Sequence, residues 1–276
     1  MSSLPQTVGV YGGGRMGAGI AHAFLSAGSD VIVVETTPET ADAARGRVEA
    51  SLAKAAERGA TGPVGRLAVS TSAHDLGAAE LVVEAVPELA DLKADVLARI
   101  ERVAPVADIA TNTSSLSVDG LAEALDDPSR LVGLHFFNPV PASALVEIVV
   151  GARTDADLVT RAQQWVAELA KTAITVTDSP GFASSRLGVV LALEAMRMLE
   201  EGVASAEDID TAMTLGYRHP VGPLRTTDIV GLDVRLGIAE HLARELGPRF
   251  EPPALLREMV AAGKLGRKSG EGFYTW

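Results

Sequence analysis

Short apolar runs rich in valine and isoleucine recur through the first half of the chain. They cover residues 8–11, 31–35, 81–86, 107–111 and 131–137. Runs that are apolar throughout are typical of strands buried on both faces of a parallel sheet. Segments with helical periodicity, such as Leu89 to Val103, lie between most of them. This alternation predicts an α/β fold with a Rossmann-type doubly wound sheet.

An alanine-rich, charge-dotted segment follows the second apolar run. It covers residues 38–60 and is longer than one crossover helix needs. We therefore expect a pair of helices to be inserted there.

A turn-forming cluster, TDSPGF at residues 177–182, interrupts the alternation of strands and helices. After it the pattern is helical over residues 186–202, 205–216 and 226–247, and Ser205 with Asp208 is suited to cap the second of these segments. A chain of 276 residues is long enough for two domains. We predict an α/β domain over residues 1–178 and an all-α domain over residues 179–276.

Charge and composition exclude several classes of function. A net charge of −12 argues against a nucleic-acid partner, because phosphate backbones are bound by clustered lysine and arginine. The chain has no cysteine, which excludes disulfides, thiolate metal sites and cysteine nucleophiles, and we expect no metal site. No apolar run approaches the roughly 18 to 20 residues of a membrane helix, and MSSLPQTV lacks the layout of a signal peptide. We expect a cytoplasmic protein without a membrane partner.

The first apolar run leads into GGGRMGAGIAHAF, in which Gly12, Gly14 and Gly17 have the G-x-G-x-x-G spacing. An ordinary strand-to-helix turn is the alternative explanation for a bare match. Here the motif follows the first predicted strand and opens a helix, so Gly12 allows a tight turn and Gly14 lets the backbone approach a pyrophosphate. Gly17 allows close packing of helix and strand, and the helix N-terminus favours an anion. We expect a dinucleotide there.

Glu35 ends the second predicted strand, 18 residues after Gly17. A carboxylate at this position accepts hydrogen bonds from the adenosine ribose and repels a 2′-phosphate. The residues that follow offer no arginine to reverse this preference. The predicted cofactor is therefore NAD rather than NADP.

The apolar stretch LHFFNPVPASALVEIVV, residues 134–150, keeps one histidine and one carboxylate, His135 and Glu147. If its two halves are antiparallel strands and Phe137 faces Leu145, then His135 lies directly opposite Glu147, within hydrogen-bonding reach. A carboxylate that orients an imidazole makes it a general base. The alternative is a buried histidine with a purely structural partner.

Ser114 follows the fourth of these apolar runs, where open α/β sheets bind ligands beyond the carboxyl ends of their strands. Its hydroxyl is suited to bind a substrate oxygen. A serine that caps the next helix is the alternative.

Taken together, these residues resemble the L-3-hydroxyacyl-CoA dehydrogenase family, including its bacterial 3-hydroxybutyryl-CoA dehydrogenases. The resemblance covers nearly the whole chain, and the glutamate twelve residues after the histidine of HFFNPVP makes it specific. The motifs that carry it are YGGGRMGAGIA, VVEAVPE, NTSSL, HFFNPVP with LVEIV, DSPGF and GRKSGEGFY.

The resemblance implies an N-terminal NAD-binding domain and a helical C-terminal domain that forms a homodimer. It implies that His135 is the general base, that Glu147 is its partner and that Ser114 binds the reacting oxygen. It also implies a helical hairpin that touches coenzyme A, to which Lys54 and Arg58 correspond. The alternative is that Lys54 and Arg58 are only solvent-exposed charges on a helix.

The same resemblance places further residues along the cofactor, among them Glu88, Lys93 and Asn138. The expected cofactor-binding set is Gly12, Gly14, Arg15, Met16, Gly17, Glu35, Glu88, Lys93, Asn112 and Asn138.

Two positions depart from the family pattern. The GF-x-x-N-R motif of the family carries an active-site asparagine, where this chain has Ser185. Serine keeps a donor and an acceptor but loses the length of the amide. Ser143 replaces a methionine that usually follows HFFNPVP, so a more polar or roomier acyl pocket is expected.

The predicted activity is reversible oxidation of an L-3-hydroxyacyl-CoA to the 3-oxoacyl-CoA, with a short chain such as 3-hydroxybutyryl-CoA favoured, in fatty-acid or related acyl-CoA metabolism. One alternative keeps the chemistry but takes an acyl-carrier-protein thioester or a free hydroxy or sugar acid. Another is a catalytically idle, structural NAD-binding protein.

Overall fold

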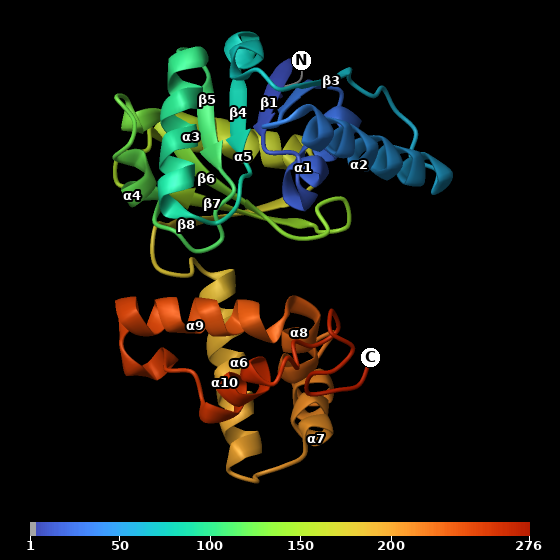
Figure 1. Ribbon diagram of the computed structural model, residues 1–276, viewed down its shortest axis with the longest axis vertical. Coiled ribbons are helices and arrows are strands. Elements are labelled where there is room, and N and C mark those ends of the chain that lie inside the picture. The colour runs from blue at the N-terminus through green and yellow to red at the C-terminus, as the bar shows by residue number, and fades with distance from the viewer. Residues whose placement is uncertain (1–3) are drawn as a thin grey trace. The chain divides into compact units, whose positions relative to one another are not determined.

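The computed structural model describes residues 4–276. Contacts along the chain divide it into two compact units (Figure 1), of which the first ends at Ser179 and the second runs from Pro180 to Trp276. The first unit combines a sheet with helices, and the second is helical. None of the helices in this part of the chain has the length and apolar character needed to cross a bilayer.

The first unit is built on an eight-stranded sheet with the order β3-β2-β1-β4-β5-β6-β7-β8. Neighbouring strands from β3 to β6 are parallel, β7 is antiparallel to β6, and β8 is parallel to β7. The predicted doubly wound α/β architecture is confirmed. The strands are β1 (Thr7–Tyr11), β2 (Asp30–Val34), β3 (Leu67–Ser70), β4 (Leu81–Glu84), β5 (Asp108–Thr111), β6 (Leu131–Phe136), β7 (Leu145–Val150) and β8 (Thr172–Thr177).

Helices cover both faces of this sheet. Figure 1 shows α3 and α5 on opposite sides of the strands. Phe24 of α1 and Trp165 of α5 share one buried cluster with the strand residues Val10 and Val83, while α3 contacts β4 and β5 and α4 contacts β6. The helical elements are α1 (Arg15–Ser26), α2 (Pro38–Glu57), η1 (Ala73–Ala78), α3 (Ala90–Val103), α4 (Val118–Ala122), η2 (Pro128–Arg130) and α5 (Ala156–Glu168).

The predicted helical pair at residues 38–60 is wrong, because a single helix, α2, occupies the segment. Thr37 caps it through a reciprocal bond with Thr40, and it runs for 20 residues without a break. Residues 59–65 hold three glycines and a proline, and Gly59 and Gly62 take positive φ angles of 88° and 156°. Such a sequence cannot continue as a second helix, so the chain passes directly into β3.

The second unit is all helical, as predicted, apart from isolated bridges near the end of the chain. Its core gathers apolar side chains of α6, α8 and α9, such as Leu193, Leu224 and Leu242. Asp228, which is buried, accepts hydrogen bonds from the amides of Phe273 and Tyr274 and so anchors the C-terminal residues. The helical elements are α6 (Ser184–Glu200), α7 (Ala206–Thr211), η3 (Ala212–Gly216), α8 (Pro223–Val230), α9 (Leu232–Leu246), η4 (Pro248–Phe250) and α10 (Ala254–Ala261).

Candidate active site

The glycine turn that joins β1 to α1 is closely packed. Gly12 has a φ of 97°, and a Cβ on Gly17 would lie 1.8 Å from the Gly12 carbonyl oxygen. By contrast, a Cβ on Gly14 would meet nothing within 4 Å, and no side chain caps α1 at this residue. The amides of Arg15 and Met16 open the helix there. An uncapped helix N-terminus beside open space fits the diphosphate of a dinucleotide.

This turn lies where the strand order of the sheet reverses. Strand β1 has β2 on one side and β4 on the other, which is the position at which open α/β sheets bind ligands. Glu35 follows β2, and its Oε1 accepts a hydrogen bond from the Gly13 amide over 2.6 Å. The carboxylate is therefore held beside the glycine turn, as a ribose-binding acid requires.

Strands β6 and β7 pair in the register that the sequence predicts, with His135 directly opposite Glu147. The Nδ1 atom of His135 lies 2.7 Å from Oε2 of Glu147. The Glu147 side chain is fully buried and that of His135 is 9 % exposed. The carboxylate at Nδ1 orients the ring and makes Nε2 the nitrogen that exchanges a proton. The arrangement is suited to accept and return a proton.

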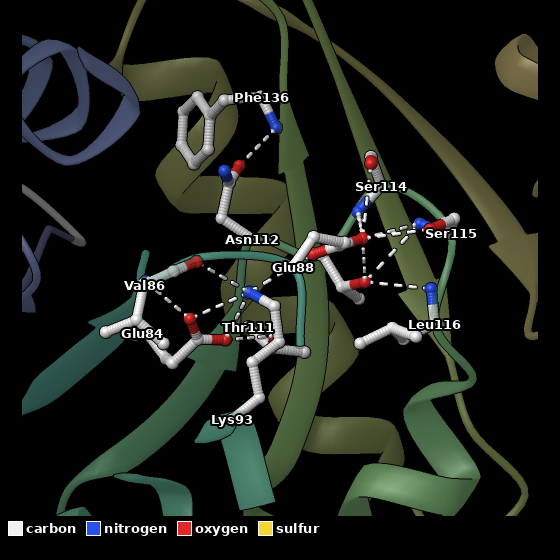
Figure 2. A network of polar contacts seen from close by, with 11 residues as sticks. Glu84, Val86, Glu88, Lys93, Thr111, Asn112, Ser114, Ser115, Leu116 and Phe136 are labelled. Carbon is white, nitrogen blue, oxygen red and sulfur yellow. Dashed lines mark hydrogen bonds and ion pairs between the residues drawn. The ribbon is translucent and has the colours of Figure 1, made fainter. Parts of the chain in front are cut away.

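The loop after β5 is organised around one carboxylate, that of Glu88. Its Oε1 accepts hydrogen bonds from the Ser114 amide over 2.7 Å and from the Ser115 amide over 3.0 Å, and the hydroxyls of both serines also reach it (Figure 2). The alternative that Ser114 caps the next helix does not hold, since Ser117 caps α4 by accepting from the Gly120 amide. Glu88 thus fixes the backbone and side chain of Ser114.

Glu88 is ionised at neutral pH. Partial burial alone would raise its pKa, but the ammonium of Lys93 and the hydrogen bonds from Thr113, Ser114 and Ser115 outweigh that effect and hold the pKa below its usual value. The loop after β5 is therefore held by hydrogen bonds to an ionised carboxylate, that of Glu88.

Lys93 lies inside the unit rather than on its surface. Its side chain is 1 % exposed, and Nζ lies 2.8 Å and 3.0 Å from the two carboxylate oxygens of Glu84. The Thr111 hydroxyl donates to the same acid, and Nζ also reaches Oε2 of Glu88 at 3.3 Å (Figure 2). Glu84 was not predicted from the sequence, although an acid that ends the apolar strand LVVE is a signal of such a pair.

Two asparagines of the expected cofactor-binding set follow neighbouring strands, Asn112 after β5 and Asn138 after β6. Asn112 follows β5, and its Oδ1 accepts from the Phe136 amide over 2.9 Å, next to His135 (Figure 2). Asn138 is exposed in the loop between β6 and β7. Lys171 holds that loop, because its Nζ donates to the carbonyl oxygens of Val140 and Ser143 over 2.7 Å and 2.6 Å.

The remaining predicted residues lie in other parts of the chain. Lys54 and Arg58 are exposed at the C-terminal end of α2, four residues apart and hence on one side of the helix. Ser185 belongs to the second unit, in the first turn of α6. Within residues 4–276 no group of three or more histidine, aspartate or glutamate side chains is placed to hold a metal ion.

Comparison with known proteins connects these features. Residues 7–179 match the family model of the 3-hydroxyacyl-CoA dehydrogenase NAD-binding domain, and residues 181–276 match that of the C-terminal domain. A 3-hydroxybutyryl-CoA dehydrogenase of Mycobacterium tuberculosis is 42 % identical, with 100 % of both chains covered. The mitochondrial hydroxyacyl-coenzyme A dehydrogenase of Sus scrofa is 38 % identical over 99 % of this chain and 92 % of its own. The crystal structure of (S)-3-hydroxybutyryl-CoA dehydrogenase from Ralstonia eutropha superposes with a TM-score of 0.94 at 39 % identity, covering 99 % of each chain.

Proposed function

The chain belongs to the 3-hydroxyacyl-CoA dehydrogenase family, and from that premise we propose how its residues carry out the reaction. It is an NAD-dependent oxidoreductase that acts on the CH–OH group of a 3-hydroxyacyl-CoA. We assign it a short-chain substrate, 3-hydroxybutyryl-CoA. Support comes from relatives of M. tuberculosis and R. eutropha that carry the name of this activity and match the full chain.

His135 acts as the general base. In the oxidative direction its Nε2 accepts the proton of the C3 hydroxyl, while Glu147 holds the ring through Nδ1 and stabilises the imidazolium that forms. When bound, NAD supplies the acceptor for the hydride that leaves C3. In the reductive direction the imidazolium returns the proton to the alkoxide oxygen. The buried His135–Glu147 pair is the observation on which the proposal chiefly rests.

Ser114 binds the same substrate oxygen. Its position is set by Glu88, which accepts from both the amide and the hydroxyl of this serine. Glu88 is in turn held by Lys93, whose ammonium is buried against Glu84. A chain of hydrogen bonds and ion pairs therefore runs from the interior of the unit to the oxygen-binding serine, so that Lys93 acts as a positioning residue.

The cofactor is bound by the switch point of the sheet. The first amides of α1, at Arg15 and Met16, would hold the diphosphate beside the open side of Gly14, and Glu35 would accept hydrogen bonds from the adenosine ribose. The glycine turn fits this role because Gly14 borders open space, whereas a Cβ on Gly12, Gly13 or Gly17 would collide with neighbouring atoms. Asn112, whose Oδ1 accepts from the Phe136 amide, and Asn138, in the loop after β6, would contact the nicotinamide side.

Lys54 and Arg58 bind the phosphates of coenzyme A from the exposed end of α2. Two cations on one helix face supply a local positive potential on a chain whose net charge is −12. In the second unit, Ser185 stands where the family carries an active-site asparagine, and we assign it a hydrogen bond to the acyl group.

The second unit also carries the surface for a homodimer. Exposed apolar side chains lie on α6, at the end of α8 and at the start of α9, and a monomer would leave them in water. Analytical ultracentrifugation should give a dimer, and a monomer at micromolar concentration would contradict the assignment. These side chains are Leu187, Leu191, Ile229, Val230 and Val234.

A substrate comparison tests the proposed function. Acetoacetyl-CoA, acetoacetyl acyl-carrier protein and free acetoacetate are supplied in turn with NADH, and the loss of NADH absorbance is followed. The expected kcat/KM is greatest for acetoacetyl-CoA, since the free acid lacks the groups that Lys54 and Arg58 bind. A higher value for the carrier-protein thioester or the free acid would contradict the assigned substrate, and absence of turnover with all three would contradict the activity.

A further inference from the structure

The carboxylate of Glu35 is held by two backbone amides. Its Oε1 accepts a hydrogen bond from the Gly13 amide over 2.6 Å, and its Oε2 accepts one from the Thr36 amide over 3.2 Å. Successive backbone N–H groups that converge on one point form concavities that bind anions, phosphate groups among them. Two such donors meet where the adenosine ribose is assigned, and in this protein the anion between them is a side chain.

The same glycine is also bound by an arginine. Nη1 of Arg47, on α2, donates to the Gly13 carbonyl oxygen over 3.2 Å. A carboxylate and a guanidinium are thus attached to the N–H and the C=O of one residue. The residues directly after Glu35 include no arginine, but the fold supplies this one from 12 positions further along the chain.

The packing of α2 on the glycine turn fixes where Arg47 lies. A Cβ built on Gly13 would lie 2.3 Å from the Cβ of Ala44, so the helix lies directly against the turn. Ala44 and Arg47 are three residues apart and share one side of the helix. The backbone of Arg47 is therefore held close to the turn, although its side chain is exposed.

No acid neutralises the charge of Arg47. None of the ion pairs formed within residues 4–276 includes it. A guanidinium has five N–H donors, and one bond to a carbonyl oxygen leaves most of them for an anion. The residues three and four positions away on α2 also carry no charge, and they are Ala43, Ala44, Ala50 and Ser51.

We propose that Arg47 is a specificity-determining residue that binds a phosphate on the 2′-oxygen of the adenosine ribose. The amides of Gly13 and Thr36 are the further donors to this phosphate once the carboxylate of Glu35 moves aside. NADP therefore competes with the protein's own carboxylate and binds less well than NAD. The inference deepens the proposed function and rests on it in one respect, the position of the adenosine ribose at Glu35.

The chemistry of these groups favours a phosphate. A guanidinium forms parallel N–H···O bonds with phosphate oxygens, and an arginine near the ribose is how dinucleotide-binding folds accommodate a 2′-phosphate. Glu35 acts in the opposite sense, because it repels the phosphate and occupies the two amides. The choice between the two cofactors is then a balance between one attractive and one repulsive side chain.

The affinities of 2′,5′-ADP and 5′-AMP test the proposal without turnover. Both contain adenosine with a 5′-phosphate, and only the first has a 2′-phosphate. Isothermal titration calorimetry gives the two Kd values, whose ratio is the preference for the 2′-phosphate. Glu35→Ala should raise this preference by about tenfold or more, because the repulsion between like charges is removed.

Arg47→Met, added to Glu35→Ala, should lower the preference again by about tenfold or more, the range of a hydrogen bond to a charged group. Arg47→Lys in the same background keeps the charge without the planar fork and should give an intermediate value. Turnover should follow binding. Glu35→Ala should reduce acetoacetyl-CoA with NADPH, and Arg47→Met should remove most of that gain.

Arg45→Met in the Glu35→Ala background is the matched control. Arg45 lies two residues before Arg47, so its side chain points to another side of α2. The variant removes the same charge from the same helix and should leave the preference nearly unchanged. Phosphate binding at the site assigned to coenzyme A would not depend on Glu35, so the effect of Glu35→Ala separates the two sites.

The proposal is overturned if Arg47→Met weakens the binding of 2′,5′-ADP and 5′-AMP by the same factor, which would assign Arg47 to the glycine turn or the diphosphate. An equal effect of Arg45→Met would also overturn it, since only the general field of the helix would then act. If the wild type does not reduce acetoacetyl-CoA with NADH, the proposed function fails, whereas the binding preference still decides the role of Arg47.

Discussion

His135 faces Glu147 across the β6–β7 hairpin, with Nδ1 of the imidazole 2.7 Å from Oε2 of the carboxylate. Side chains alternate between the two faces of a strand, so a slip of one residue in this register would move one partner to the other face of the sheet. Gly133, two residues before His135 and so on the same face of β6, lies close to Val149 and to Val118 of α4, which places the pair on the face of the sheet that α4 covers. The hairpin register therefore brings the carboxylate against Nδ1 and sets the direction of the imidazole.

Glu147→Gln should lower kcat for acetoacetyl-CoA reduction by about 10² or more, since loss of a carboxylate that orients a catalytic histidine costs up to about 10⁴. The amide still fills the space but no longer stabilises the imidazolium. The affinity for NADH, measured by fluorescence titration, serves as the control and should not change. A near-normal kcat would show that Glu147 is only a structural partner.

Lys93→Met should destabilise the protein by about 3 to 5 kcal/mol, because it leaves the carboxylate of Glu84 buried without its cation. Urea unfolding measures this difference. The double variant Lys93→Met, Glu84→Gln removes both charges and should recover a large part of the lost stability. Equal stability of the single and double variants would contradict a buried ion pair at this position.

The free energy of unfolding should depend on pH through the ionisation of Glu88. Its pKa in the folded protein lies below the unfolded value of 4.5, so its contribution is fully present above that pH and is lost as the pH falls through the folded pKa. The unfolding free energy of the wild type relative to Glu88→Gln should accordingly be constant above pH 4.5 and shrink below it. Urea unfolding over a pH series tests this. A difference that does not depend on pH would contradict the assignment.

Glu35→Ala should raise the use of NADP relative to NAD by about tenfold or more. The carboxylate beside the Gly13 amide repels a 2′-phosphate, and its removal takes away both that repulsion and the hydrogen bonds to the ribose. The ratio of kcat/KM for the two cofactors measures the effect. Asp42→Ala, an exposed acid on α2, is the control for a general change of charge. An unchanged ratio would place the adenosine ribose elsewhere.

The sequence predicts the central strands well and the edge strands poorly. Strands β1, β2, β4, β5 and β6 coincide with the predicted apolar runs to within two residues at either end, because helices cover both of their faces. The outer strands β3 and β8 escaped prediction, since neither strand has a fully buried residue and β8 carries three exposed threonines. An edge strand buries less apolar surface, so its sequence carries less of the signal that a central strand does.

Long-range contacts mark a second limit of the sequence. The pairing of His135 with Glu147 follows from local register, and it was predicted. The pairing of Lys93 with Glu84 joins a helix to a strand, and the approach of Arg235 to Gly188 joins two helices 47 positions apart. The hydrophobic periodicity of a single segment does not predict contacts between distant segments. Only the packing of the elements brings these residues together.

The most direct measurement compares His135→Gln with the wild type in the reduction of acetoacetyl-CoA by NADH, with NADH affinity determined in parallel. Glutamine retains polar atoms but cannot take up the proton. The expected result is a kcat lower by about 10² to 10⁴ with the affinity for NADH unchanged. A kcat close to that of the wild type would contradict the role of His135 as the general base.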